Sequence, residues 1–328
     1  IGHTPMIRLR RASEATGCEI LGKAEFLNPG GSIKDRTALG LVDDAQERGL
    51  LQPGTTLIEG TAGNTGIGLA LVGASRGFRT IIVMPNSQSQ EKIDALRLTG
   101  AEVRLVPPAK FADPKHYVHQ AEALCEQMNA DQPGSAWFAG QFDNVANRAI
   151  HERMTGPEIW ADLDGKIDGF VCSAGTGGSL AGIATALKAR NPKVATALAD
   201  PFGSALAHFI NHGELKAEGN SFTEGIGSSR ITPNFKDAPL DFAWSIADTE
   251  SVPLLHELLY HEGLCMGGST GVNIAGAIRL ARELGRGHTI VTLLADGGQR
   301  YQRKLYNPAF LREKGVAVPD WLQRSFPD

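Results

Sequence analysis

The chain has 328 residues, of which 42% are hydrophobic and 21% charged, and its 32 lysines and arginines against 36 aspartates and glutamates give a net charge of −4. These values are typical of a globular protein of about two domains and exclude a disordered or fibrous chain. The mildly acidic balance provides no basic surface for nucleic acid. No apolar run reaches the roughly 18 residues that a membrane span needs, so neither nucleic acid nor membrane is expected as a partner.

Cysteine and glycine usage adds two expectations. The four cysteines, Cys18, Cys125, Cys172 and Cys265, are far apart and form no C-x-x-C pair. They fit neither a zinc site nor a disulfide framework, and Ile1–Pro5 shows no signal-peptide pattern, so a reducing cytoplasm is the expected location. Glycine is unusually frequent at 39 residues, about 12% against a usual ~7%, and many glycines cluster in short loops.

Short β-branched runs alternate with amphipathic stretches along the chain. In chain order, the first half predicts strand Glu19–Phe26, helix Ile33–Arg48, strand Thr55–Ile58, helix Asn64–Ser75, strand Thr80–Met84, helix Gln90–Thr99, strand Glu102–Val106, and helices Pro114–Met128 and Asn144–Ile159. The second half predicts strand Gly169–Cys172, helix Leu180–Ala189, strand Val194–Ala199, helices Val252–His261 and Gly271–Leu284, and strand Thr289–Leu294. This alternation indicates an α/β protein with parallel sheets flanked by helices. Such sheets bind ligands beyond the carboxyl ends of their strands, so the loops after strands are the candidate sites.

The first candidate loop is Asn28–Arg36, with the sequence NPGGSIKDR. Its Pro-Gly-Gly segment predicts a tight turn, and Ser32 is expected as the N-cap of the following helix. Lys34 would then lie in the first helical turn, where the helix dipole disfavours a cation, and this suits an amine that acts as a nucleophile. A solvated lysine near a helix start explains the same residues, and this loop alone favours that second interpretation.

Two more glycine-rich loops join a strand to a helix. Glu59–Gly66, EGTAGNTG, offers backbone N–H groups and small polar side chains at a positive helix end, which suits a carboxylate or phosphate. Glycines that serve only close packing explain this loop equally well. Ser173–Ser179, SAGTGGS, has three glycines and added hydroxyl donors, and it predicts a cradle for a single phosphate. It is neither a P-loop nor a full dinucleotide motif, because Leu180 stands where the last glycine would be.

Other segments of the sequence are candidates for a hydrolase site, a metal site or a functional loop. Gly267–Gly271, GGSTG, matches the nucleophile elbow of serine hydrolases, but a predicted helix precedes it and the required order of acid and histidine is missing. His151-Glu152 lacks a second histidine at the right offset, and His116 and His119 indicate a solvated helix face, so no metal site is expected. The long irregular segment Asn211–Pro233 predicts a functional loop.

Taken together, the loops resemble the cysteine synthase and cystathionine β-synthase family of pyridoxal-phosphate enzymes, which have the tryptophan-synthase-β-like fold (fold type II). The resemblance covers the chain from end to end, and its specificity lies in the order and spacing of the motifs. These motifs are IGHTP at 1–5, GSIKDR at 31–36, TAGNTG at 61–66, QFDN at 141–144, TGPEIW at 155–160, GTGGS at 175–179, EGIG at 224–227 and GQRY at 298–301. The resemblance implies a homodimer with a smaller, mobile substrate-binding domain at 39–144 and a larger cofactor-binding domain formed by 1–38 and 145–328.

The resemblance also implies roles for individual residues. Lys34 would form the Schiff base with pyridoxal phosphate, and Asn64 would bond the hydroxyl oxygen of its ring. The phosphate loop would consist of Gly175, Thr176, Gly177, Gly178 and Ser179. The substrate carboxylate would be held by Thr61, Gly63, Thr65 and Gln141, with Ala62 in the same substrate loop and Gly225 in the loop over the active site.

Two positions depart from the family pattern. Ala62 stands where cysteine synthases commonly have serine, and the missing hydroxyl removes a polar contact near the substrate. Asp296 lies where the family offers a serine to the pyridine nitrogen, and a carboxylate there would keep that nitrogen protonated. A shift of one residue in the alignment changes the candidate, and a carboxylate that only caps a turn explains Asp296 as well.

The resemblance implies β-replacement on an activated serine, which makes L-cysteine from O-acetylserine and sulfide through an α-aminoacrylate. The partners would be a small amino acid and sulfide or a thiol. The alternative is β-elimination of cysteine to sulfide, pyruvate and ammonia, which Ala62 favours. A non-catalytic regulatory homologue that binds the cofactor is the interpretation from a different class.

Overall fold

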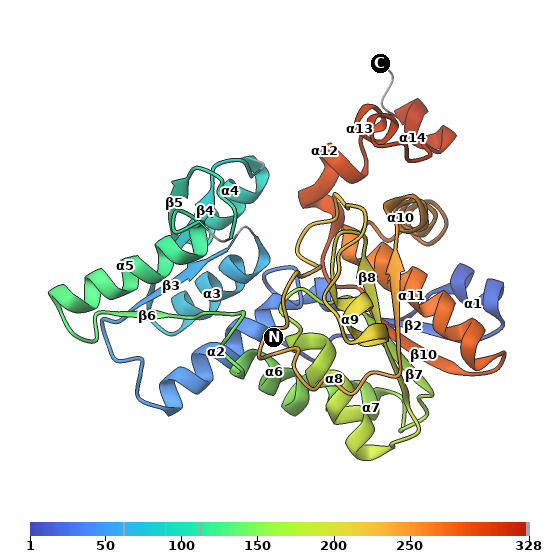
Figure 1. Ribbon diagram of the computed structural model, residues 1–328, viewed down its shortest axis with the longest axis horizontal. Helices are drawn as coiled ribbons and strands as arrows, with labels where there is room; N and C mark the ends of the chain where they lie inside the picture. Colours follow the sequence, from blue (N-terminus) through green and yellow to red (C-terminus); the bar gives the residue numbers. More distant parts are fainter. Residues whose placement is uncertain (62, 89, 112, 326–328) are drawn as a thin grey trace. The chain divides into compact units, whose positions relative to one another are not determined.

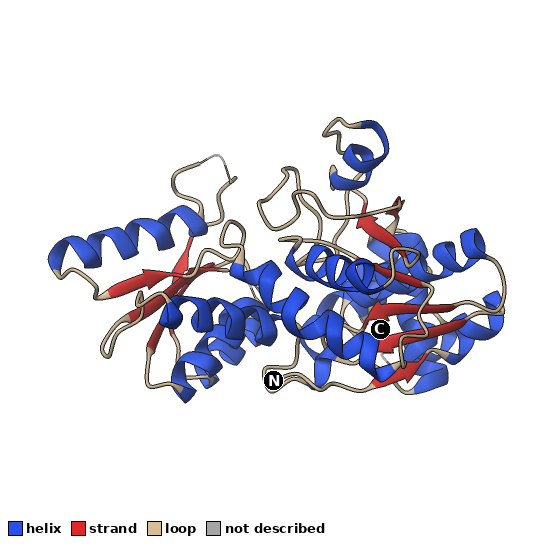
Figure 2. Ribbon diagram, turned by 90° about the horizontal axis from the view of Figure 1, so that it is seen from below, coloured by secondary structure: helices blue, strands red, loops and turns tan. Residues whose placement is uncertain are grey.

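The computed structural model describes residues 1–61, 63–88, 90–111 and 113–325, and it contains two separate sheets with helices around each of them (Figures 1 and 2). Packing divides the chain into two units. The first consists of Ile1 and Leu27–Ile150, and the second of Gly2–Phe26 and His151–Asp328. The predicted α/β class with mostly parallel sheets is confirmed.

The first unit has a four-stranded parallel sheet in the order β5-β4-β3-β6. The strands are β3 (Thr56–Gly60), β4 (Arg79–Pro85), β5 (Glu102–Val106) and β6 (Ala136–Phe138), and the helices are α2 (Lys34–Glu47), α3 (Asn64–Ser75), α4 (Gln90–Leu98), α5 (Tyr117–Asp131) and α6 (Ala146–Ile150). All of β3 is buried, as is typical of a central parallel strand. Leu57 packs into one cluster with α2 and α3, while its neighbour Ile58 packs into another with α5, so helices cover both faces of this sheet.

The second unit has a six-stranded sheet in the order β1-β2-β10-β7-β8-β9, with only the β1–β2 pair antiparallel. Its strands are β1 (Met6–Arg8), β2 (Glu19–Lys23), β7 (Gly169–Cys172), β8 (Ala195–Pro201), β9 (Phe242–Ile246) and β10 (Thr289–Leu293). Its longer helices are α1 (Arg10–Thr16), α7 (Gly156–Asp162), α8 (Gly178–Arg190), α9 (Leu206–His212), α10 (Asp248–Glu262) and α11 (Gly268–Leu284), followed by α12 (Gln302–Leu305), α13 (Pro308–Glu313) and α14 (Asp320–Ser325). Strand β10, from the far end of the sequence, lies between β2 and β7.

Eight strands and α-helices were not expected from the sequence: β1, α1, β6, α9, β9, α12, α13 and α14. Two of these strands have only three residues each, too short to show a period. The helix expected at Asn144–Ile159 is divided into α6, a π-helical turn at His151–Thr155, and α7. The N-cap position of α2 is Ile33 and not the expected Ser32, and Ile33 makes no side-chain hydrogen bond there. The Ser32 hydroxyl nevertheless accepts a hydrogen bond from the Lys34 N–H at 3.2 Å.

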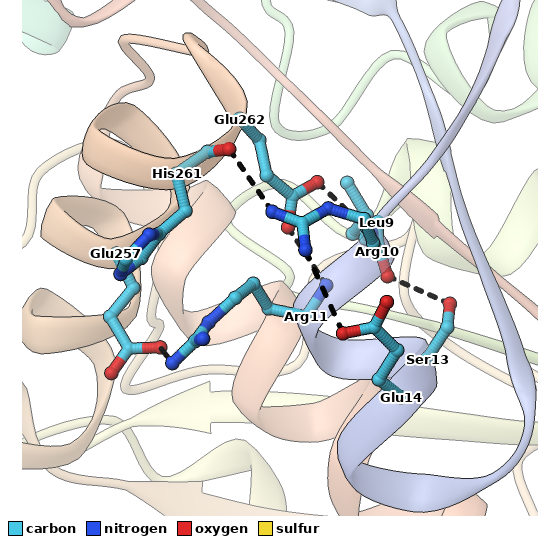
Figure 3. Close-up of polar contacts among 8 residues, drawn as sticks. All are labelled: Leu9, Arg10, Arg11, Ser13, Glu14, Glu257, His261 and Glu262. Carbon is cyan, nitrogen blue, oxygen red and sulfur yellow. Dashed lines mark hydrogen bonds and ion pairs between the residues drawn. The ribbon is translucent and has the colours of Figure 1, made fainter.

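Helix α1 shows why a local pattern failed to predict it. Its N-cap residue, Leu9, provides no side-chain hydrogen bond. Instead, the Glu262 carboxylate at the end of α10 accepts from the backbone N–H groups of Arg10 and Arg11 at 3.0 and 2.9 Å (Figure 3). The Arg10 guanidinium in turn donates to the His261 carbonyl at 3.3 Å. The cap of this helix therefore comes from a residue about 250 positions away in the sequence, as tertiary capping allows.

The packing units and the domains implied by the resemblance differ in their limits. By packing, the first unit begins at Leu27 because α2 packs against α3 and α6 of the same unit. The functional division into 39–144 and 1–38 plus 145–328 stays a prediction. Within the described part of the chain, no helix has the length and apolar character to cross a membrane.

Candidate active site

Two predicted substrate-binding residues meet at one edge of the first sheet. Strands β3 and β6 are parallel neighbours, so the loops that follow them start at the same edge. The first loop leads into α3 with Thr65, and the second carries Gln141. The Thr65 hydroxyl donates to Gln141 Oε1 at 2.6 Å, and both side chains are buried.

The start of α3 has the features of an anion site. Gly63 is the N-cap and Asn64 the first residue of this 12-residue helix, and a glycine N-cap offers no side-chain hydrogen bond to the first turn. The N–H groups of the first turn of a helix have no partners within the helix, and the dipole makes that end positive. The Thr61 hydroxyl accepts from the Gly63 N–H at 3.3 Å and shapes the approach to the helix. Ala62 lies outside the described residues.

Lys34 is the first residue of α2 and is partly buried. The two helices approach closely at this point, because a Cβ on Gly68 of α3 would lie 2.9 Å from the Lys34 carbonyl oxygen. The preceding turn is closed by Asp35 Oδ2, which accepts from the Gly30 N–H at 2.5 Å. The backbone around Lys34 is therefore closely packed, and the choice between a catalytic and a solvated lysine stays a prediction.

A buried set of hydrogen bonds links the helix of Lys34 to the Gln141 loop. The Thr37 hydroxyl on α2 donates to Asn147 Oδ1 at 3.1 Å. Asn147 Nδ2 donates to the Gln141 carbonyl at 2.8 Å, and both Thr37 and Asn147 are fully buried. The predicted residues of the first unit, Lys34, Thr61, Gly63, Asn64, Thr65 and Gln141, therefore belong to one connected region.

In the second unit, the predicted cofactor-binding residues follow two parallel neighbouring strands, β7 and β10, at the edge of the sheet where both strands end. The amide of Asn273 on α11 connects the two strand ends, since Oδ1 accepts from the Ser173 N–H at 2.7 Å and Nδ2 donates to the Leu293 carbonyl at 2.8 Å. The loop Ser173–Ser179 and the segment that contains Asp296 consequently begin on neighbouring strands.

The glycine-rich loop that leads into α8 fits a phosphate group. Gly177 is the N-cap of this 13-residue helix with a φ of +87°, and a glycine there offers no side-chain hydrogen bond to the first turn. A Cβ on Gly177 would lie 2.5 Å from the Phe235 Cβ, and a Cβ on Gly175 would lie 2.5 Å from the Gly225 carbonyl oxygen. The structure thus brings Gly175 and Gly225 together, and a helix that begins at a glycine-rich turn is the kind that binds phosphate.

The segment 223–235 donates hydrogen bonds to the backbone of the glycine-rich loop Ser173–Ser179. The Gly227 N–H donates to the Ala174 carbonyl at 2.7 Å, and the Thr232 hydroxyl donates to the Thr176 carbonyl at 2.6 Å. Part of the irregular segment that the sequence marked as functional is therefore a support for the glycine-rich loop.

His151 contacts the last residue of that loop. Its Nε2 lies 3.1 Å from the Ser179 hydroxyl, and its Nδ1 lies 2.9 Å from the Thr155 hydroxyl. The ring is fully buried and lies in the π-helical turn, a distortion that is frequent at functional sites. The expectation that His151 holds no metal is consistent with these two hydroxyl contacts.

Asp296 is buried and accepts a hydrogen bond from the Tyr301 hydroxyl at 2.6 Å. Burial, followed by the nearby Asp296 charge, raises the pKa of Tyr301 well above its usual value, so the phenol keeps its proton and donates. Gly267 is needed beside this carboxylate, because a Cβ there would lie 2.1 Å from Asp296 Oδ1. The GGSTG segment opens α11 after an isolated β-bridge at Met266, so the strand that a nucleophile elbow requires is absent from this described segment.

Four polar residues that support the candidate site were not predicted from the sequence: His151, Asn147, Asn273 and Glu59. The carboxyl group of Glu59 contacts the side chain of Gln141. Each is a polar residue within a helix or strand whose partner is distant in the sequence. The one local signal was Glu59, a carboxylate at the end of an otherwise apolar strand. No cluster of three or more histidine, cysteine, aspartate or glutamate residues that could hold a metal occurs in the described ranges.

Comparison with known proteins agrees with this geometry. Residues 1–296 match the family model described as pyridoxal-phosphate dependent enzyme. The chain is 50% identical to cysteine synthase 1 of Neurospora crassa, over 99% of this chain and 87% of that protein. It is 41% identical to cystathionine beta-synthase of Rattus norvegicus, over 96% of this chain and 56% of that protein. Among solved structures, a hydrogen sulfide-producing enzyme of Fusobacterium nucleatum matches with a TM-score of 0.81 and 32% identity, over 92% of this chain and 95% of that one.

The chain therefore belongs to the family of pyridoxal-phosphate-dependent enzymes, in the branch that contains the cysteine synthases. The family resemblance and the cofactor that the sequence predicted are confirmed. The roles of individual residues stay predictions.

Proposed function

We propose that this enzyme makes L-cysteine from O-acetylserine and sulfide by β-replacement at the substrate's β-carbon. The support from relatives is the 43–50% identity to cysteine synthases of three organisms over nearly the whole chain. The observation that carries the proposal is the contact of Thr65 with Gln141 at the start of α3, a pair of polar side chains beside a positive helix end.

Pyridoxal phosphate, when bound, supplies an electron sink for the charge that develops at the substrate's Cα. In this proposal Lys34 holds the cofactor and afterwards moves the Cα proton. Asn64 would hold the ring hydroxyl oxygen of the cofactor, and Asp296, which accepts a hydrogen bond from Tyr301, would be the partner of the ring nitrogen. The N–H groups and hydroxyls of Gly175–Ser179 would hold the cofactor's phosphate.

The substrate carboxylate is assigned to the first unit. Thr61, Gly63, Thr65 and Gln141 surround the start of α3, whose dipole favours a negative charge. Fixing the carboxylate there orients the Cα–H bond toward the base, which is the positional part of catalysis. Gly225 belongs to the loop that is proposed to cover the site.

The test is an assay of purified enzyme with O-acetylserine and sulfide, measuring cysteine, together with the variant Lys34→Ala. The wild type is expected to form cysteine and to show the visible absorbance of bound cofactor. Lys34→Ala is expected to lose that absorbance and to lower the rate by about 10³-fold or more. Reduction with borohydride followed by peptide mass spectrometry should find the cofactor on Lys34, and attachment to another lysine would overturn the assignment.

A second candidate activity is β-elimination of cysteine, which yields sulfide, pyruvate and ammonia. Its support is the similarity to the hydrogen sulfide-producing enzyme of Fusobacterium nucleatum, together with the alanine at position 62. Cysteine alone is then the substrate, and sulfide and pyruvate are measured. If neither assay exceeds the rate with free cofactor, the interpretation as a non-catalytic cofactor-binding homologue would replace both.

We also propose a cytoplasmic homodimer. The cysteines are free thiols, three of them buried, which fits a reducing compartment. The support for a dimer is the family resemblance. Sedimentation equilibrium should give twice the chain mass of 34.9 kDa, and a single-chain mass would contradict the proposal.

A further inference from the structure

Glu59 is a buried carboxyl group outside the set of residues that the resemblance assigned. It is the fourth residue of β3, and only 1% of its surface is exposed. Its Oε1 accepts a hydrogen bond from Gln141 Nε2 at 3.2 Å, and among the described residues its Oε2 has no hydrogen-bond partner. Burial raises the pKa of Glu59 to about 8, an effect that the nearby backbone of Gln141 and Gly140 and the Gln141 side chain partly offset.

This arrangement is unfavourable for stability alone. A buried polar atom without a partner costs free energy, and the neighbouring positions of β3 are occupied by Leu57 and Ile58. An apolar residue at position 59 would avoid that cost. The retained carboxyl therefore points to a task in the site.

The task follows from what Gln141 contacts. Its amide nitrogen donates to Glu59, its amide oxygen accepts from the Thr65 hydroxyl at 2.6 Å, and its backbone carbonyl accepts from Asn147. These contacts determine which end of the amide faces which neighbour. Orientation matters because the carbonyl oxygen of a carboxyl group accepts from an N–H group, whereas a second carbonyl oxygen turned toward it would be repelled.

We propose that Glu59 is a positioning residue that keeps the Gln141 amide, and through it the Thr65 hydroxyl, oriented for the substrate carboxylate. This inference rests on the proposed function, because it takes Gln141 and Thr65 as the residues that bind the carboxylate. Glu59 itself touches neither substrate nor cofactor in this account. Its effect reaches the substrate only through Gln141.

A double-mutant cycle in the holoenzyme tests the proposal. Glu59→Leu keeps the approximate size and removes the acceptor, and we expect a KM for O-acetylserine about 10-fold higher with kcat changed less than about threefold, since carboxylate binding is lost in ground and transition state alike. Gln141→Ala should raise KM by a similar factor. Adding Glu59→Leu to Gln141→Ala should then raise KM by less than about twofold, because the partner is already gone. If the two effects multiply, Glu59 acts independently of Gln141 and the proposal is overturned.

Asp200→Asn is the matched control. Asp200 is also a fully buried carboxyl in a parallel strand, β8, and burial raises its pKa to about 6. It accepts from the Ala207 N–H at 2.8 Å and has no contact with Gln141. Its KM for O-acetylserine should stay within about twofold of wild type. If Asp200→Asn raises KM as much as Glu59→Leu does, loss of any buried carboxyl explains the result and the proposal is overturned.

A second measurement separates this inference from the proposed function. The side-chain amide resonance of Gln141, assigned with Gln141→Ala and recorded without amino acid, should shift in Glu59→Leu and stay in place in Asp200→Asn. An unchanged resonance in Glu59→Leu would refute the positioning role even if the enzyme makes cysteine. A shifted resonance in a protein that makes no cysteine would leave the Glu59–Gln141 contact standing and refute the proposed reaction.

Should Glu59→Leu fail to fold, Glu59→Gln takes its place in the same cycle. A neutral amide can present either oxygen or nitrogen to Gln141, so we expect KM to rise about threefold in the wild-type background and to stay unchanged beside Gln141→Ala. An equal rise in both backgrounds would overturn the proposal.

Discussion

His151 illustrates how the site depends on single residues that are remote in sequence from the groups they hold. Its imidazole fills the space between the Thr155 and Ser179 hydroxyls, and Ser179 ends the proposed phosphate loop. With an oxygen partner on each ring nitrogen, the imidazole has a defined orientation. The hydroxyl of Ser179 is therefore held from behind by the π-helical turn.

We expect His151→Ala to weaken cofactor binding. Loss of one buried hydrogen bond of about 1–1.5 kcal/mol corresponds to an approximately tenfold higher dissociation constant for pyridoxal phosphate. The measurement is a titration of the apoprotein with cofactor, followed by visible absorbance. His256→Ala is the control, because His256 is also buried in the second unit but contacts the Leu305 carbonyl. Equal weakening in both variants would show that a buried cavity, and not the Ser179 contact, is responsible.

At the scale of elements, the glycine-rich loops are shaped by close packing as well as by the ligand they are proposed to bind. Gly177 starts α8 in the left-handed region, and Phe235 packs against its Cα. Side chains are strained at such a φ and would also clash here. The start of the helix is thus available to an anion only while position 177 is glycine.

We expect Gly177→Ala to lower the melting temperature and to abolish cofactor retention, because both the left-handed backbone and the Phe235 contact oppose a Cβ. Gly213→Ala is the matched control. Gly213 ends α9 with a φ of +76°, but a Cβ there would meet nothing within 4 Å. That variant should lose about 1 kcal/mol and keep its cofactor, as judged by thermal unfolding and absorbance. Cofactor retention by Gly177→Ala would contradict the assignment of this loop.

At the scale of the whole molecule, two buried carboxyls give stability a definite pH dependence. Burial raises the pKa of Glu59 from 4.5 to about 8 and that of Asp200 from 3.8 to about 6. Between the unfolded and folded values the folded state binds the extra proton, so stability falls as pH rises. Each group contributes a loss of up to about 1.4 kcal/mol per pH unit within its own window.

Glu59→Gln should reduce the loss of stability per pH unit that the wild type shows as pH rises. Between pH 6 and pH 8, above the Asp200 window, the melting temperature of wild type should fall more steeply than that of Glu59→Gln. The variant removes the proton that the folded state of wild type still binds there. Melting curves at pH 5, 6, 7 and 8 check this expectation. Parallel curves from pH 6 to 8 would mean that Glu59 is already ionised in the folded protein at pH 6.

Much of the fold could be predicted because its elements have strong local patterns. The buried strands β3, β4, β7 and β10 are short apolar β-branched runs, and α3 and α8 begin directly after glycine-rich turns. The elements that were not predicted from the sequence lack such local patterns. Strand β9 is a half-buried edge strand, and α1 takes its cap from Glu262, so neither has a signal within its own sequence.

The sequence by itself determined the α/β class, the positions of the glycine-rich loops and, through the order of its motifs, the family. It could do so because strand period, helix period and turn chemistry depend on residues a few positions apart. Only the tertiary structure decided that Gln141 lies against Thr65 and Glu59, that His151 holds Ser179, and that Gly225 lies against Gly175. These contacts join residues from 28 to 82 positions apart, because parallel strands bring the ends of distant segments to one edge of a sheet.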